Sequence, residues 1–275
     1  MRSLTRMNRP VTLIQKAINI LVSEGPASLS ARTASSLNTR VRSRFQRAAL
    51  SELERIATSD IPNSEKFALI YQKRLWFKVF SHLNPDKSLS GHGSTQESTR
   101  VLRPNLEKFL RDADAKTFLD APCGDFNWMK SVSLPDDCRY IGGDIVPELA
   151  ARLQETYGRP DGGPANMSRR FVSLDLTRDS FPPADVWLCK DCLQHLSNDD
   201  VQLVLDNFRR SQVKIALISN HVGVSVNADI KSGAFRSVDL TRPPFNLPPP
   251  RQTLADSPVD DEARYVGVWH REDLD

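Results

Sequence analysis

The strongest constraint on the fold is an alternation of short apolar segments with amphipathic stretches between residues 116 and 220. The short segments are residues 116–120, 139–144, 170–175, 184–189 and 213–219. Short apolar runs that alternate with helical patterns are typical of βαβ units, whose strands lie parallel to one another. The sequence therefore predicts an α/β protein with a doubly wound, mostly parallel sheet.

Helices are expected around these strands, and the tail is expected to differ. Apolar residues at helical spacing predict helices over residues 64–83, 97–112, 126–132, 147–157 and 198–211. Five prolines lie between residues 243 and 250, so no long helix fits there. Residues 265–269 alternate in the manner of a strand, which we expect to close the sheet in the antiparallel sense.

The charge of the chain is unevenly distributed. The net charge is +3, but residues 1–50 carry +8 and the rest of the chain carries −5. A basic arm suits a weak contact with a membrane surface or a protein. Phe45 is the single aromatic residue of the arm, so stacking on bases has little support and nucleic-acid binding is not expected.

The cysteines and the apolar runs indicate the compartment. Four cysteines in 275 residues do not make a disulfide scaffold, so we expect a reducing, cytoplasmic location. Residues 11–22 form an apolar run that is too short and too polar for a transmembrane segment. Cys189, Cys192 and His195 have the spacing of metal ligands, but a closed zinc site needs four ligands and no second Cys-x-x-Cys exists. No metal is expected.

Three of the predicted strands end in a carboxylate. Asp120, Asp144 and Asp175 stand at the ends of the first three strands, and a tight turn over residues 121–125 follows the first. Aspartate is also common at helix starts and in turns. However, ligands of doubly wound sheets bind at the carboxyl ends of the strands, so three acids in register predict a binding site there.

The sequence of residues 116–220 resembles that of the class I S-adenosylmethionine-dependent methyltransferase superfamily. Residues 118–125 (FLDAPCGD) resemble its first motif, an acid-ended strand with a small-residue turn. Residues 140–144 resemble the second motif, whose acid binds ribose, and residues 171–176 resemble the third, which meets adenine. Residues 185–196 resemble the fourth strand and the helix entry that faces the substrate. The run DAPCGDF at residues 120–126 is similar to a narrower bacterial group.

The resemblance implies a Rossmann-like fold, S-adenosylmethionine as the cofactor, and a set of site residues. The expected cofactor-binding residues are Asp120, Cys123, Gly124, Asp144, Asp175, Leu176 and Lys190. The expected catalytic residues, which would remove a proton from an oxygen or nitrogen acceptor, are Asp191 and His195. The expected substrate-binding residues are His221, Arg236 and Arg242. The polar loops around the site favour a small polar molecule or a glycan-type acceptor.

Physical reasoning supports the cofactor independently of the resemblance. A carboxylate such as Asp144 can accept both hydrogen bonds of a ribose diol, and it lies about 20 residues after Gly124, as a ribose-binding acid does. A nicotinamide dinucleotide needs a Gly-x-Gly-x-x-Gly turn for its pyrophosphate, whereas the turn over residues 121–125 has one glycine. Asp120 and Asp125 would repel phosphates and attract a sulfonium or an ammonium. An inactive S-adenosylmethionine-binding module and, less favoured, an NAD-linked oxidoreductase remain the alternatives.

The predicted organisation has two parts. Residues 1–60 are the basic arm and lead-in, and residues 61–275 are the methyltransferase domain. Within that domain we expect a helical cap, a core, and a substrate loop with terminal strands. Their ranges are 64–112, 116–220 and 221–275.

Overall fold

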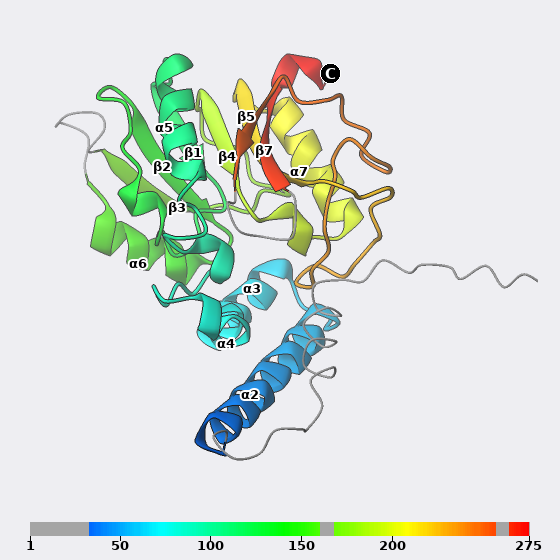
Figure 1. The fold of residues 1–275 in the computed structure, drawn as a ribbon. Helices are drawn as coiled ribbons and strands as arrows, with labels where there is room; N and C mark the ends of the chain where they lie inside the picture. Colours follow the sequence, from blue (N-terminus) through cyan, green and yellow to red (C-terminus); the bar gives the residue numbers. More distant parts are fainter. Residues whose placement is uncertain (1–32, 160–167, 257–263, 275) are drawn as a thin grey trace, which may run out of the picture. The chain divides into compact units, whose positions relative to one another are not determined.

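The computed structural model describes residues 33–159, 168–256 and 264–274, with side chains from residue 44 onward (Figure 1). The chain divides into two compact units, residues 1–44 and residues 45–275, and the second contains the sheet. The boundary predicted at residue 60 stays a prediction. Most of the basic arm, including the apolar run at residues 11–22, lies outside the described residues.

A single seven-stranded sheet forms the centre of this unit (Figure 1). Its strands are β1 (Thr117–Asp120), β2 (Arg139–Asp144), β3 (Arg169–Ser173), β4 (Val186–Cys189), β5 (Ile215–His221), β6 (Gln252–Ala255) and β7 (Arg264–His270). Their order is β3-β2-β1-β4-β5-β7-β6, and β1 to β5 pair in parallel. Strand β7 runs antiparallel to both β5 and β6. The predicted doubly wound sheet with an antiparallel C-terminal strand is confirmed.

The register of the sheet brings the predicted acids to one edge. Asp120, the last residue of β1, pairs with Gly142 of β2 and Leu188 of β4. Asp144, the last residue of β2, pairs with Ser173 at the end of β3. The strand order changes direction between β1 and β4, which is where doubly wound folds bind their ligands.

The helices that surround the sheet follow the sequence pattern in some places only. The described helices are α2 (Thr33–Ala57), α3 (Asn63–Gln72), α4 (Leu75–Val79), α5 (Leu102–Asp112), α6 (Pro147–Tyr157) and α7 (Asn198–Arg210). The continuous helix predicted for residues 64–83 is wrong, because Arg74 adopts a left-handed φ of 55° between α3 and α4. The helix predicted for residues 126–132 is also wrong. Phe126 has a φ of 59°, and only Met129–Ser131 form a 3₁₀ turn.

The core packs around the central strands. Every residue of β4 is buried, as expected for a strand covered on both faces. The ring of Trp187 lies 4.9 Å from that of Phe181 and 5.4 Å from that of Phe208 on α7, measured between centroids. Its Nε1 donates a hydrogen bond of 2.8 Å to the carbonyl oxygen of Ala121. Trp187 therefore ties α7 and the turn after β1 to the middle of the sheet.

Within the described ranges, none of the helices combines the length and the apolar character that a membrane crossing requires.

Candidate functional site

Two buried carboxylates stand at the ends of β1 and β2. Asp120 Oδ2 accepts a hydrogen bond of 2.7 Å from the Tyr140 hydroxyl. Burial raises the pKa of Asp120 to about 7; the charge of Asp144 adds to the rise and the Tyr140 bond opposes it. Burial likewise raises the pKa of Asp144 to about 6, although backbone N–H groups donate to it. Both carboxyls therefore gain a proton more readily than an exposed aspartate does.

The Asp144 carboxylate is held in place by backbone groups. Its Oδ2 accepts from the N–H of Gly124 at 3.1 Å, and its Oδ1 accepts from the N–H of Val146 at 3.1 Å. The N–H of Ile145 also donates to this carboxylate, so three backbone groups hold it. The turn after β1 is thereby tied to the end of β2.

The turn after β1 is closely packed. The Cys123 N–H donates to the carbonyl of Gly143 at 2.8 Å, and the peptide between Ala121 and Pro122 is cis. Gly124 adopts a φ of 56°, which favours glycine. A Cβ placed on Gly124 would lie 2.4 Å from Ser90 Oγ, so the position also excludes a side chain for lack of space.

Asp175 and Leu176 lie beyond the end of the third strand. Strand β3 stops at Ser173, two residues earlier than the segment predicted from the sequence. The Asp175 carboxylate accepts from the N–H and hydroxyl of Thr177 and from Arg178 Nε at 2.9 Å. Leu176 is buried, and its carbonyl accepts from Asn207 at 3.0 Å. Their assignment to an adenine pocket stays a prediction.

A buried ion cluster occupies the end of β4. Lys190 Nζ forms an ion pair with Asp191 and donates 3.0 Å to the carbonyl of Gly93. Arg264 NH1 lies 3.6 Å from Asp191, and Arg264 Nε lies 2.9 Å from Asp256. The two cations and two anions of this cluster balance in charge. Asp256 and Arg264 have no local signal in the sequence. Asp256 follows β6 and Arg264 begins β7, so both approach β4 only through the antiparallel end of the sheet.

The position of Asp191 favours an electrostatic role over proton removal. Burial opposes its ionisation, but the positive charges of Arg264 and Lys190 outweigh burial and hold the pKa of Asp191 well below its ordinary value. A carboxylate with so low a pKa is a weak proton acceptor. Its predicted catalytic role stays a prediction, and the geometry fits best a carboxylate that pairs with the neighbouring cations Lys190 and Arg264.

His195 has the geometry of a neutral base. Its Nδ1 lies 2.8 Å from the carbonyl oxygen of Ala234, so Nδ1 carries the proton and Nε2 keeps a lone pair. Burial lowers the pKa of His195 below its ordinary value. The ring lies between Trp76, at 5.4 Å, and Phe235, at 5.6 Å between centroids. Trp76 precedes His195 in the sequence by more than a hundred residues, and no short-range signal placed it here.

His221, at the end of β5, complements His195. His221 Nδ1 lies 3.2 Å from the backbone nitrogen of Val238 and 3.3 Å from its carbonyl oxygen, so this ring nitrogen meets both a donor and an acceptor of one residue. Burial lowers the pKa of His221 to about 4. Among the described residues, Nε2 is buried without a hydrogen-bond partner. The ring of Phe235 lies 6.5 Å from that of His221, so one aromatic side chain approaches both histidines.

The two predicted substrate arginines have different environments. Arg236 is 4% exposed; its guanidinium donates to the carbonyl of Leu196 and, at 2.9 Å, to Asn198 Oδ1. Arg242 is exposed and lies 3.7 Å from Asp239. Arg236 therefore fastens the loop after β5 to the start of α7, whereas Arg242 faces solvent. Their contact with an acceptor stays a prediction.

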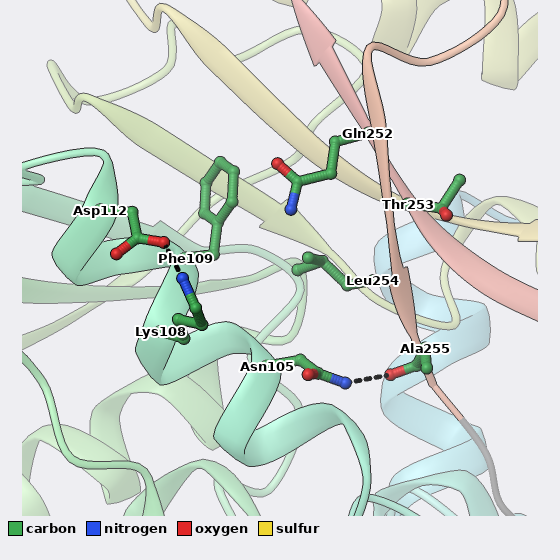
Figure 2. Close-up of a pocket in the computed structure, with 8 residues that line it drawn as sticks. All are labelled: Asn105, Lys108, Phe109, Asp112, Gln252, Thr253, Leu254 and Ala255. Carbon is green, nitrogen blue, oxygen red and sulfur yellow. Dashed lines mark hydrogen bonds and ion pairs between the residues drawn. The ribbon is translucent and has the colours of Figure 1, made fainter.

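The cysteines of the described chain form no disulfide, and a cavity in it is lined by residues other than the predicted site residues. Cys123, Cys138, Cys189 and Cys192 are free thiols, and no cluster of metal-ligating side chains exists in the described parts of the chain. A cavity of about 310 Å³ lies between α5 and β6, where Asn105 donates 3.3 Å to the carbonyl of Ala255 (Figure 2). Its lining includes none of the predicted site residues.

The sheet order with its antiparallel β7, together with the surrounding helices, defines the Rossmann-like fold of the class I methyltransferases. No protein-family model matches this sequence, and no curated protein matches it. Many solved structures match this chain.

The structure of PigF with SAH aligns over 82% of this chain and 70% of its own, at 12% identity and a TM-score of 0.51. The mitomycin 7-O-methyltransferase MmcR aligns over 83% of this chain and 68% of its own, at 14% identity and a TM-score of 0.50. Human N-acetylserotonin methyltransferase, in complex with SAM, aligns over 65% of this chain at 17% identity and a TM-score of 0.43. The present chain covers 49% of that enzyme's length.

Proposed function

We propose that this protein is an S-adenosylmethionine-dependent methyltransferase that acts on oxygen or nitrogen of a small polar or glycan-type acceptor. The observation that carries the proposal is the pair of buried carboxylates, Asp120 and Asp144, at adjacent strand ends of a methyltransferase fold. The structural neighbour PigF was solved with SAH, and MmcR is named as a mitomycin 7-O-methyltransferase. Both facts support the cofactor, and the second supports an oxygen acceptor.

The donor set fits this cofactor. Asp144 would present its carboxylate to the ribose diol, held in place by the N–H groups of Gly124 and Val146. Asp120 and Asp144 are desolvated carboxylates whose raised pKa values would fall again beside a positive charge. Such a pair suits a ligand that carries a sulfonium and an ammonium. When bound, the cofactor supplies a methyl group activated by its sulfonium.

We assign the proton transfer to His195. The acceptor hydroxyl or amine would lose its proton to Nε2 of His195, whose Nδ1–H is fixed by the carbonyl of Ala234. His221 would form a hydrogen bond to the acceptor through Nε2, because that nitrogen has no partner in the described part of the chain. Trp76 and Phe235 border His195 and would exclude water from this region.

The cofactor is tested by calorimetric titration with S-adenosylmethionine, S-adenosylhomocysteine and NAD. We expect binding of the first two and none of NAD. Asp144→Ala should weaken binding by at least about thirtyfold, because a charged bidentate hydrogen bond contributes about 2–3 kcal/mol or more. Asp112→Ala, an exposed acid on α5, serves as the control. Unchanged affinity in Asp144→Ala would contradict the ribose assignment.

Catalysis is tested separately from binding. Release of S-adenosylhomocysteine in the presence of a small-molecule extract is expected from an enzyme and not from an inactive binding module. We also propose a cytoplasmic location, which the four free thiols support. The partners proposed for the basic arm rest on its charge alone.

A further inference from the structure

A loop from the N-terminal part of the chain crosses the proposed cofactor site. Residues 88–94, called the strap below, begin beside the turn after β1 and end beside β4. At the first end, Asp125 accepts hydrogen bonds from the strap. At the other end, the carbonyl of Gly93 accepts 3.0 Å from Lys190 Nζ. The strap therefore connects the two strand ends between which the strand order reverses.

Both carboxylate oxygens of Asp125 accept hydrogen bonds from the strap. Oδ2 accepts from the N–H of Leu89 at 2.6 Å. Oδ1 lies within bonding distance of two hydroxyls, those of Ser88 at 3.1 Å and Ser90 at 3.2 Å. The N–H of Asp125 donates 2.9 Å back to Ser90 Oγ. The sequence suggested a different role for this acid, the attraction of a sulfonium, but its acceptor positions are taken up by the strap.

The strap lies directly on the residues assigned to the cofactor. A Cβ on Gly124 would meet Ser90 Oγ at 2.4 Å and the Tyr71 hydroxyl at 3.3 Å. Tyr71 and Ser90 are themselves joined by a hydrogen bond of 2.8 Å. At the other end, a Cβ on Gly93 would lie 2.5 Å from Asp191 Oδ2. Asp144, which bonds to the N–H of this same Gly124, is only 3% exposed, and Asp120 is 2% exposed.

We propose that Asp125 is a positioning residue that latches the strap over the cofactor site, so that the cofactor enters and leaves only when this latch opens. The proposal rests on the proposed function, because it concerns access to the same site. Bonds to an ionised carboxylate are roughly twice as strong as bonds between neutral groups, so one charge is enough to hold a polar loop of seven residues. The short strap can then open locally without unfolding of the sheet.

The first test measures the strap without any cofactor. Hydrogen exchange of a peptide that covers residues 88–94 is compared in the wild type, Asp125→Ala and Asp112→Ala. We expect exchange to be at least about tenfold faster in Asp125→Ala, since the bonds lost are charge-assisted. Peptides from β1, β4 and β5 should be unchanged, and so should the control. Equal exchange of the strap in all three proteins would overturn the latch.

The second test separates a latch from a direct cofactor ligand. Stopped-flow binding of S-adenosylhomocysteine gives the association and dissociation rates. Loss of a latch should raise both rates several-fold and leave the dissociation constant within a few-fold. Loss of a direct ligand should raise the dissociation rate alone and weaken affinity by the same factor, which would overturn the proposal.

Two further arms keep the result interpretable. If Asp125→Ala does not fold, the double variant Ser88→Ala, Ser90→Ala removes the hydroxyl donors and leaves the carboxylate in place. The same faster exchange is expected from it, and unchanged exchange would again contradict the latch. If the wild type binds no S-adenosylhomocysteine, the proposed function fails, whereas the exchange experiment still decides whether Asp125 holds the strap.

Discussion

At the scale of single residues, the site depends on groups whose protonation is set by burial. Asp120 and Asp144 are carboxyls with raised pKa values, and His195 and His221 are imidazoles with lowered ones. In each case burial favours the neutral form. Burial therefore weakens the ionisation of these four side chains, and a charged ligand would change the protonation of those it meets.

The raised pKa of Asp120 predicts a pH-dependent stability. The folded protein holds this proton up to about pH 7, whereas the unfolded chain releases it near 3.8. The contribution of Asp120 to the free energy of unfolding is therefore complete below pH 4 and lost as pH rises through 7. Asp120→Asn removes the titration and keeps an oxygen for the Tyr140 hydroxyl. Relative to the wild type, the variant should be more stable at pH 8 than at pH 5 by roughly 1–3 kcal/mol.

Chemical denaturation at the two pH values measures this difference. Asp112→Asn is the matched control, because Asp112 is an exposed acid in a surface ion pair, and its variant should behave alike at both pH values. A stability difference for Asp120→Asn that is the same at pH 5 and pH 8 would show that Asp120 titrates normally in the folded protein.

The second residue-scale prediction concerns His195. Replacement by alanine removes the proton acceptor at Nε2, so turnover should fall by about 10²–10⁴-fold. Affinity for S-adenosylhomocysteine should stay within a few-fold, because Asp120 and Asp144 lie on β1 and β2 and do not bond to His195. His82→Ala, an exposed histidine far from β4 in the sequence, is the control. Full turnover of His195→Ala on an acceptor that the wild type methylates would exclude His195 as the base.

At the scale of elements, the sequence predicted the strands and helices that have a periodic apolar pattern. It did not predict the breaks and turns that depend on contacts with residues distant in the sequence. The five parallel strands and helix α6 follow from apolar runs and their caps, because those patterns are local. The break between α3 and α4 at Arg74 and the left-handed Phe126 have no local signal. In the second case the strap and Asp125 shape the chain from a distance of about 35 residues.

The loop after β5 gives a prediction at this scale. Arg236 is buried and bonds the loop to the residues that begin α7, whereas Arg242 is exposed. Arg236→Ala should lower the free energy of unfolding by roughly 2–3 kcal/mol, since it leaves buried acceptors unpaired. Arg242→Ala should change it by less than about 0.5 kcal/mol.

Denaturation curves and turnover of the two variants separate stability from acceptor binding. Arg242→Ala tests the predicted acceptor contact, because its fold should be intact. Reduced turnover at unchanged affinity for S-adenosylhomocysteine would support that contact, and full turnover would show that Arg242 does not touch the acceptor. Equal stability of both variants would contradict the structural role of Arg236.

At the scale of the whole molecule, the site is assembled from three separate parts of the sequence. Asp120, Asp144 and His195 lie in the core and were found from strand ends and a resemblance. Trp76 and Ser90 come from before the core, and Arg264 comes from after it. No periodicity or spacing connects these parts, because their contacts depend on the completed sheet. The sequence therefore predicts the residues at the strand ends of the candidate site. The contacts of Trp76, Ser90 and Arg264 with them become visible only in the folded chain.

The last prediction concerns where the folded unit begins. The second half of α2 belongs to it: Ala49, Ile56 and Ala57 are buried, and the carbonyl of Ala57 accepts 3.0 Å from Lys66 Nζ. Deletion of residues 1–44 should leave the cooperative unfolding transition within about 0.5 kcal/mol of the full chain, as surface changes do.

Deletion of residues 1–60 removes these contacts and should lower the free energy of unfolding by at least about 3 kcal/mol, because Ile56 alone buries a full aliphatic side chain. Thermal and chemical denaturation of the two truncated proteins beside the full chain measure both effects. If the longer deletion unfolds as the shorter one does, the second half of α2 does not stabilise the unit. If the shorter deletion already loses cooperativity, the basic arm itself is part of the folded domain.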